Sequence, residues 1–271
     1  MGKIIYFFKK ILYKIWRGIV IICTFKNWTI WLSEKWNLFP KYKKGDEAIV
    51  HLRNGINICF KFRNNEFCGI DDIWCNKVYT KYKQIQDGDI VIDIGANIGA
   101  FSIFAVAAAR NVKVLSYEPS PAPFKRFLKN IKMNNLEKNI FPFQLAVAKE
   151  RGERTLFFDS KGSIGDTITP SQNNLINYKN NPIIVKAITL KDIFEDNNLT
   201  HCDFLKMDCE GAEYEILFNT PPEYLQKIEN IVVEYHKGSK EIIKILEDLK
   251  FLIQLEPWTK HQGLIFGKKR K

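Results

Sequence analysis

The sequence predicts an α/β fold, built on a doubly wound, mostly parallel seven-stranded sheet of Rossmann-like architecture. Residues 90–99 read IVIDIGANIG, a β-branched strand that runs into a glycine turn and then into the helical segment FSIFAVAAA. Further strand-like and helix-like segments alternate along the rest of the chain, which is typical of such a sheet. With 271 residues, of which 46% are hydrophobic, the chain has material for one large core.

The first half of the chain supplies the start of this sheet. Residues 46–62 predict a short hairpin with Asn54-Gly55 at its turn, and residues 70–85 predict a helix that leads into the strand at 90–94. A second strand, KVLSYEPS, ends near Glu118 and is stopped by Pro119 and Pro121 before a helix around 124–130.

The second half continues the alternation. FPFQLAVA (141–148), RTLFF (154–158) and IIVKAIT (183–189) predict strands, and Thr189 predicts the N-cap of a helix. HCDFLKMD (201–208) and IENIVVEYH (228–236) predict buried strands that are each followed by a helix, and FLIQLE and QGLIFG predict an antiparallel pair. The polar residues 159–181 predict a long loop, in which 162–165 would be the hinge of a substrate lid, and passive disorder is the alternative.

The glycine turn predicts a binding site for a nucleotide-like ligand. Gly95 permits a sharp turn, Gly99 permits close packing of the new helix, and Ala96 and Asn97 lie between them. Asp93 precedes the turn, and a carboxylate there suits the cationic amino group of S-adenosylmethionine better than the pyrophosphate of NAD. A helix-capping turn without any ligand is the alternative.

A second acid supports this interpretation. Glu118 follows Gly95 by 23 residues and falls at the tip of the second strand. Nucleotide sites of this type place an acid about 20 residues on, where it accepts both ribose hydroxyls. A solvated glutamate at a strand end is the alternative.

Four motifs, VIDIGANIG, YEPSP, LKMDCEGAEYEIL and IENIVVEYH, together resemble the FkbM family of S-adenosylmethionine-dependent methyltransferases over residues 67–267. The resemblance implies a class I methyltransferase fold and, for many members, O-methylation of a hydroxyl on a sugar or polyketide. Together with the turn, it assigns the S-adenosyl-L-methionine site to Asp93, Gly95, Ala96, Asn97, Gly99, Glu118, Pro119, Ser120 and Ala146.

The acceptor side is predicted at the ends of the later strands, because ligands of such sheets bind outside the carboxyl ends. The candidate catalytic residues are Asp208, His236 and Glu210, with Glu213 and Glu234 nearby. His236 is the natural base at neutral pH, and Asp208 is its rival. A divalent cation held by Asp208, Glu210 and His236 is a third possibility, and these donors suit Mg²⁺ or Mn²⁺. We assign no metal ligand, so a metal cofactor is an alternative and not an expectation.

Each catalytic candidate also has a structural alternative. His236 could cap its strand through a hydrogen bond to the backbone, and Glu210 and Glu213 could stabilise the start of a helix.

The N-terminus carries a separate signal. Residues 1–44 contain ten Lys or Arg and one acid, Glu34, so their formal charge is +9 of the chain's +11. Within residues 3–22, four basic side chains fall within roughly 60° of one another on a helix that is mostly apolar, namely Lys3, Lys10, Lys14 and Arg17. This pattern predicts a helix that lies on the membrane surface, with contact through residues 3–36, and the alternative is packing on the domain or on a second subunit.

We therefore predict four segments. These are a basic amphipathic helical segment (1–44), a hairpin-plus-helix element (45–85), the methyltransferase domain (86–267) and a basic tail (268–271). The six cysteines form no C-x-x-C pair, which favours a reducing compartment and argues against zinc. A cytoplasmic protein, peripheral on the cytoplasmic membrane face, is the expected location.

The predicted activity is methylation of a hydroxyl on a saccharide, glycan or glycolipid. The alternatives are a nicotinamide-dependent oxidoreductase and a non-catalytic binding module of the same fold at a membrane. A specific nucleic-acid partner is not expected, because residues 45–267 carry a net charge of −2. The acceptor would be a small molecule or glycan, and the oligomeric state has no signature in the sequence.

Overall fold

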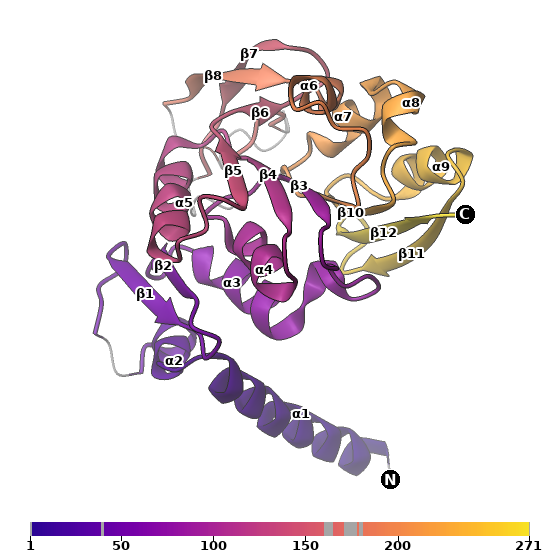
Figure 1. Cartoon of the computed structure of the whole chain (residues 1–271). Coiled ribbons are helices and arrows are strands. Elements are labelled where there is room, and N and C mark those ends of the chain that lie inside the picture. Colours follow the sequence, from indigo (N-terminus) through magenta and orange to yellow (C-terminus); the bar gives the residue numbers. More distant parts are fainter. Residues whose placement is uncertain (1, 39–40, 160–164, 171–177, 179–180, 271) are drawn as a thin grey trace. The chain divides into compact units, whose positions relative to one another are not determined.

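The computed structural model describes residues 2–38, 41–159, 165–170, 178 and 181–270, with residues 2–9 and 11 described by their backbone alone. The chain forms two compact units, Met1–Lys77 and Val78–Lys271, whose elements are labelled in Figure 1.

The first unit contains two helices, a hairpin and a short helical segment. Helix α1 spans Gly2–Thr24 and α2 spans Thr29–Trp36. Strands β1 (Glu47–His51) and β2 (Asn57–Lys61) pair in antiparallel register from Glu47↔Lys61 to His51↔Asn57. Gly55 has φ 97° in the connecting turn, so the predicted hairpin is confirmed. Within the part of the chain that is described, no helix combines the length and apolar character needed to cross a bilayer.

The predicted helix at 70–85 is wrong in its extent. Helix α3 spans Glu66–Asp71, continues as the π-helical turn η1 (Asp72–Asn76) and ends at Lys77. Lys77 has φ 52°, a left-handed conformation that cannot continue a right-handed helix. A single 3₁₀ turn, η2 (Val78–Thr80), follows. Tyr79, which the prediction placed inside the helix, therefore lies in this 3₁₀ turn, in the second unit.

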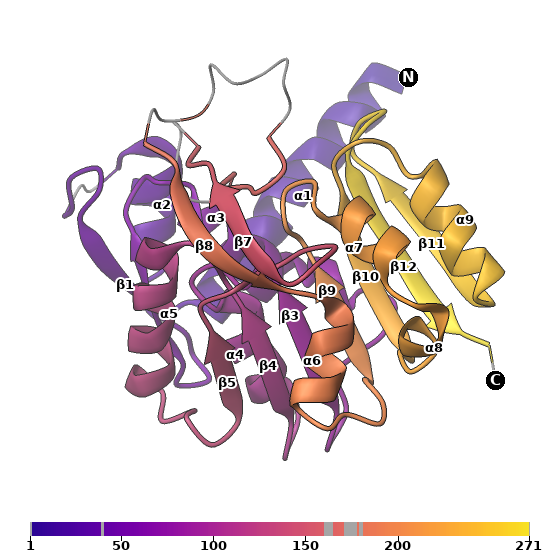
Figure 2. The same cartoon turned by 90° about the horizontal axis from the view of Figure 1, so that it is seen from above.

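The second unit is built on a seven-stranded sheet with the strand order β11-β12-β10-β9-β3-β4-β5, which Figure 2 shows from above. In chain order the strands are β3 (Ile90–Ile94), β4 (Lys113–Tyr117), β5 (Ile140–Phe143), β9 (Phe204–Met207), β10 (Asn230–Tyr235), β11 (Phe251–Pro257) and β12 (Gly263–Lys269). Strands β3, β4, β5, β9 and β10 are parallel, whereas β12 runs antiparallel to both β10 and β11. The predicted doubly wound, mostly parallel sheet is confirmed.

The order of the strands reverses between β3 and β9. From β3 the chain runs outward through β4 and β5, and it later returns to β9 and continues through β10 on the other side. Ligands of doubly wound sheets bind outside the carboxyl ends of the strands at such a switch point. Asp93 and Asp208 lie at or just past the ends of these two strands.

Helices cover the sheet, and one group of them forms the main core. The helices are α4 (Ala100–Ala108), α5 (Pro121–Met133), α6 (Leu190–Asp196), α7 (Glu213–Asn219), α8 (Pro222–Leu225) and α9 (Lys240–Asp248). Residues of α6, α7 and α9 pack with Ile92, Leu205 and Ile231 in one large buried cluster. The predicted cap at Thr189 is confirmed, because Thr189 and Asp192 form a reciprocal capping box.

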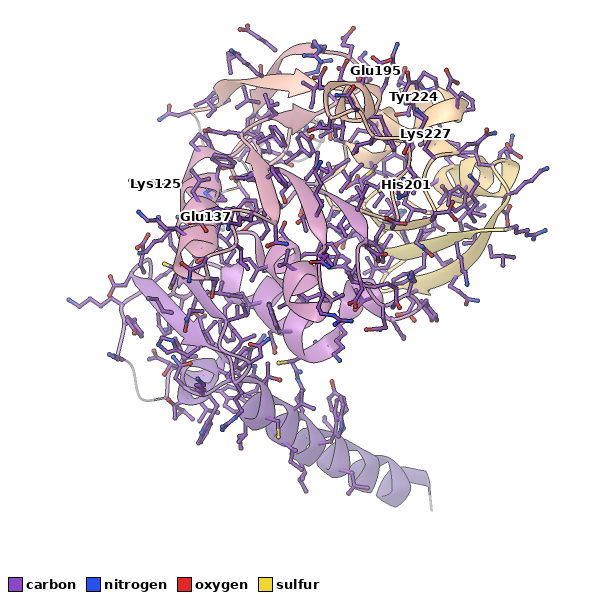
Figure 3. All side chains as sticks on the ribbon, in the orientation of Figure 1. Lys125, Glu137, Glu195, His201, Tyr224 and Lys227 are labelled. Atoms are coloured by element: carbon purple, nitrogen blue, oxygen red, sulfur yellow. The ribbon has the colours of Figure 1, made fainter. Side chains whose placement is uncertain are left out.

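The outer ends of α6 and α8 carry polar contacts of their own. Tyr224 of α8 donates a hydrogen bond to Glu195 of α6 at 2.5 Å, and Lys227 lies 4.7 Å from the centre of the Tyr224 ring (Figure 3). These contacts join two neighbouring helices and lie outside the candidate site.

The opposite face of the sheet carries a group of polar residues among apolar ones. Side chains alternate along a strand, so the positions between the core residues point to the other side. Asp93 of β3, Lys206 of β9 and Glu234 of β10 share this second face with Ser102 of α4, which bonds to Asp93. A buried sheet face with three charged groups calls for a functional or electrostatic explanation.

Three predicted strand segments differ in their pairing. Strands β6 (Ala146–Val147), β7 (Gly152–Leu156) and β8 (Ile183–Ile188) form a separate sheet in the order β6-β8-β7. The segment 141–148 is therefore two strands, since Ala146 and Val147 pair with β8 and not with β4.

Two further expectations concern segments outside the sheet. Lys268 and Lys269 belong to β12, so the basic tail predicted at 268–271 is shorter than expected. Of the predicted lid hinge at 162–165, all but Gly165 lies outside the described residues.

The two turn glycines are needed for close packing. A Cβ at Gly95 would lie 1.7 Å from the backbone oxygen of Asp208, and a Cβ at Gly99 would lie 2.0 Å from the Phe127 ring. Gly99 thus makes room for α5, whereas the sequence predicted close contact with its own strand. Both residues also have positive φ, at 79° and 80°.

We predict that Gly99→Ala lowers the unfolding free energy more than Gly88→Ala. Gly88 has φ 83° and open space around it, so its substitution adds only backbone strain of about 1–2 kcal/mol. Gly99→Ala adds overpacking against Phe127, which costs about 1–3 kcal/mol more. Urea unfolding of both variants measures the difference, and equal losses would contradict the packing argument.

Candidate active site

The candidate site begins with a buried ion pair across the switch point. Asp93 and Lys206 are register partners on β3 and β9, and their charged groups lie 3.2 Å apart. Both side chains are buried, and Ser102 donates a second hydrogen bond to Asp93 at 2.6 Å. Lys206 also donates to the carbonyl oxygen of Gly95 at 2.7 Å. The charge of Asp93 is thus balanced by the ammonium group of Lys206. The predicted contact of Asp93 with the amino group of S-adenosylmethionine stays a prediction.

The glycine turn and Glu118 are joined by hydrogen bonds. The amides of Gly95 and Ala96 donate to the carbonyl of Tyr117 at 3.0 Å. The amide of Asn97, which has φ 50°, donates to Glu118 at 2.8 Å. The sequence placed these residues at one nucleotide site, and the structure brings them together at the ends of β3 and β4.

Glu118 is held in a buried position that suits contact with a ligand's hydroxyls. The amide of Ser120 donates to its second oxygen at 2.7 Å, and the Ser120 hydroxyl donates to Asp166 at 2.7 Å. Burial raises the pKa of Glu118 to about 7, although the two backbone amides partly offset this rise. Pro119 follows the strand and is half-buried, and Ala146 is buried in β6.

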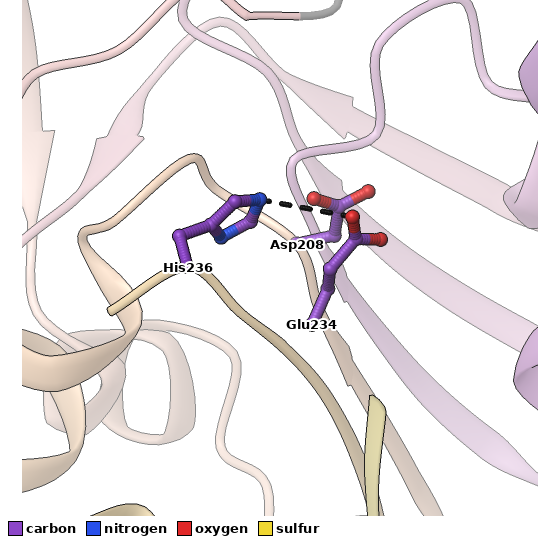
Figure 4. Close-up of side chains that lie close together, drawn as sticks. All are labelled: Asp208, Glu234 and His236. Carbon is purple, nitrogen blue, oxygen red and sulfur yellow. Dashed lines mark ion pairs between the residues drawn. The ribbon is translucent and has the colours of Figure 1, made fainter. Parts of the chain in front are cut away.

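The acceptor side consists of carboxylates at the ends of β9 and β10. The hydroxyl of Tyr79 donates to Asp208 at 2.8 Å and lies 3.2 Å from Glu234, so one phenol bridges both acids. Figure 4 shows Asp208, Glu234 and His236 side by side. Burial raises the pKa of Glu234 well above its usual value, and the nearby charge of Asp208 raises it further.

His236 lies among several acids. Its Nδ1 is 3.2 Å from the fully buried Glu213, and its Nε2 is 3.3 Å from Glu210 and 3.7 Å from Glu234. Burial alone would lower the pKa of His236, but the hydrogen bond and charge of Glu213, with Glu210 and Asp208, raise it to about 10. At neutral pH the ring is therefore an imidazolium, with a proton on both nitrogens. It cannot accept a further proton, which favours Asp208 over His236 as the proton acceptor.

The two glutamates after Asp208 have different environments. Glu213 accepts hydrogen bonds from the amides of Cys209 and Gly211 at 2.9 and 2.8 Å, so it fixes the turn before α7. Glu210 has φ 54°, and burial raises its pKa to about 8 against the opposing charge of His236. Stabilising the start of a helix, the structural alternative for both glutamates, therefore describes Glu213 better than Glu210. The Glu210 carboxylate faces His236 instead.

One group of side chains can hold a cation. Among the described residues, ligand atoms of Asp208, Glu234 and His236 lie within 4.8 Å of one another. Two carboxylates and one imidazole suit Mg²⁺ or Mn²⁺, as the sequence suggested, although Glu234 takes the place expected of Glu210. Because His236 binds metal only as the neutral imidazole, a cation there would compete with its proton.

Sequence reasoning missed Tyr79 and the pairing of Asp93 with Lys206. Tyr79 fell within a predicted helix, and no local pattern relates it to residues more than a hundred positions away. Lys206 offered a usable signal, because a lysine in the apolar segment FLKMD must meet an acid when the strand is buried. Glu234 and His236 are two positions apart in sequence, which places both on one side of β10.

We predict that Glu118 makes stability depend on pH. Its folded-state pKa of about 7 exceeds the usual 4.5, so the folded protein binds an extra proton between these values. Stability should therefore fall as pH rises from 4.5 to 7, by about 1.4 kcal/mol per pH unit for this group. Urea unfolding at pH 5 and 7.5 should show that Glu118→Gln removes this fall, whereas exposed Glu137→Gln (Figure 3) keeps it. The same pH dependence in all three proteins would refute the assignment.

Comparison with known proteins places this site in a family. A sequence profile of the Methyltransferase FkbM domain matches residues 93–254. Methyltransferase 1 of Beauveria bassiana is 27% identical over 238 residues, covering 81% of this chain and 92% of that protein. The 31-O-demethyl-FK506 methyltransferase FkbM of Streptomyces tacrolimicus is 22% identical over 213 residues, covering 68% of this chain and 81% of that protein.

Among solved structures, the methyltransferase FkbM of Methylobacillus flagellatus is 14% identical to this chain, with a TM-score of 0.47. The match covers 70% of this chain and 47% of the Methylobacillus chain. The family profile spans the strand ends that carry Asp93, Glu118, Asp208 and His236, and it covers more than half of the chain. On this match the chain is a methyltransferase that belongs to the FkbM family.

Proposed function

We propose that this protein transfers the methyl group of S-adenosylmethionine to a hydroxyl of a saccharide, glycan or glycolipid at the cytoplasmic face of a membrane. The observation that carries the proposal is the group of carboxylates at the ends of β9 and β10, next to a nucleotide-type turn. The Streptomyces relative is named for an oxygen position, which supports methylation of oxygen.

The turn and Glu118 would hold the cofactor. Glu118 lies at the tip of β4, where an acid accepts hydrogen bonds from both ribose hydroxyls. Its neighbours Asn97 and Ser120 fix the carboxylate through their amides, so the ribose would meet an already oriented acceptor. The cofactor supplies an activated methyl group, and the chain's own residues bind it, orient the acceptor and take up a proton.

The acidic site matches an acceptor with several hydroxyls. A carboxyl group accepts hydrogen bonds and, when protonated, also donates one, and a sugar offers several hydroxyls that do both in a small volume. Asp208, Glu210 and Glu234 face the same region as His236. A polyhydroxylated acceptor would therefore find several hydrogen-bond partners there.

Asp208 is the residue that we assign as the base. As the bond between the acceptor oxygen and the methyl carbon forms, the carbon–sulfur bond breaks and the hydroxyl proton passes to the Asp208 carboxylate. S-adenosylhomocysteine and the methyl ether are the products. Protonated His236 and Lys206 each place a positive charge beside the acids of this site.

The direct test is incubation of the protein with a host glycan and lipid extract and a deuterium-methyl cofactor. Mass spectrometry should find label in ether linkage on a saccharide hydroxyl. Label in tRNA, or on nitrogen, would contradict the assigned acceptor class. Cofactor binding without label in any fraction would instead support a non-catalytic module.

We predict that Asp208→Asn lowers kcat about 100-fold or more, because a positioned general base contributes at least this much. The amide keeps the size of the side chain and can still accept from Tyr79, so cofactor affinity should stay close to that of the unchanged protein. Exposed Glu223→Gln is the matched control and should keep full turnover. Turnover by Asp208→Asn within a few-fold of the control would rule out Asp208 as the base.

A further inference from the structure

An apolar stripe runs along helix α1. Five of its side chains, Leu12, Ile15, Trp16, Ile19 and Ile22, are 42–63% exposed. At 100° per residue they fall within about 120° of one another, so they form one continuous face. A water-exposed row of five large apolar side chains is a typical contact surface for a partner or a membrane.

The other side of the same helix is fixed within the first unit. Ile21 is buried, and the Arg17 guanidinium pairs with Asp71 at 2.5 Å with only 12% of its side chain exposed. Arg53 donates from its side chain to the carbonyl of Ile22 and from its amide to that of Thr24. Since these contacts set the rotation of α1, the apolar stripe is presented by a packed helix and not by a free one.

Two exposed basic side chains of α1 lie away from the stripe. Lys10 and Lys14 are exposed and fall roughly 140–180° from Ile19 around the helix. A helix in a bilayer interface has this arrangement, with its apolar face among the acyl chains and its lysines at the headgroups and in water. Trp16 sits in the stripe, and tryptophan is enriched at the interfacial level.

We propose that α1 binds the surface of an anionic phospholipid bilayer through the stripe Leu12, Ile15, Trp16, Ile19 and Ile22. Charge decides the occupant of this face. Residues 1–44 carry +9, so two copies that met through α1 would bring like charges together, whereas anionic lipid offers the opposite charge. This inference is independent of the methyl acceptor proposed above.

Flotation of the full chain with vesicles tests the proposal. The protein should float with phosphatidylcholine–phosphatidylglycerol (3:1) vesicles, and much less with phosphatidylcholine alone or in 0.5 M NaCl. The double variant Trp16→Ser, Ile19→Ser should lose roughly tenfold or more of its affinity for the vesicles. The matched control is Leu252→Ser, Leu255→Ser on β11, which removes side chains that are 50% and 41% exposed and should float like the unchanged protein.

The outcomes separate this proposal from its rivals. Failure of the unchanged protein to float, or equal flotation of both double variants, would overturn it. A lipid-free dimer that Trp16→Ser, Ile19→Ser dissociates would assign the stripe to a second copy instead. S-adenosylhomocysteine binding by every variant shows that the domain is folded, and a negative acceptor experiment would leave the vesicle result unaffected.

Discussion

The buried ion pair between Asp93 and Lys206 is the interaction on which the rest of this site depends. It joins the two strands at the topological switch point, and neither charge reaches water. Removing one partner would leave an uncompensated buried charge, a change that typically costs 3–5 kcal/mol. Asp208 follows Lys206 by two residues, and its carboxylate lies 3.9 Å from the Lys206 ammonium. The ion pair therefore also holds the first residue of the acceptor side in place.

The same balance of charge organises the acceptor side. Asp208, Glu210, Glu213 and Glu234 gather around one imidazole, and the first three of these acids raise its pKa to about 10. Tyr79 supplies a hydrogen bond between two of these acids, which would otherwise repel each other. Such a site offers several carboxyl groups in a small volume, and these groups are the physical basis for a hydroxyl-rich acceptor.

The sequence predicted the main sheet because β-branched segments mark its strands and glycine or proline residues mark its turns. The spacing predicted that Asp93, Asn97 and Glu118 lie close together, since strand ends of a parallel sheet meet at one edge, and the structure brings them together there. The pairing of Ala146 with β8 could not be found in this way, because β-branched segments do not specify their partners. Tyr79 was assigned to a helix that ends at the left-handed Lys77, and lysine carries no local signal for that conformation.

A crystal structure of the protein with S-adenosylhomocysteine bound tests the account most directly. We predict the ribose hydroxyls within hydrogen-bond distance of Glu118, and the sulfur directed towards Asp208. An adenosyl group bound elsewhere, or a Glu118 carboxylate turned away from the ribose, would contradict the account.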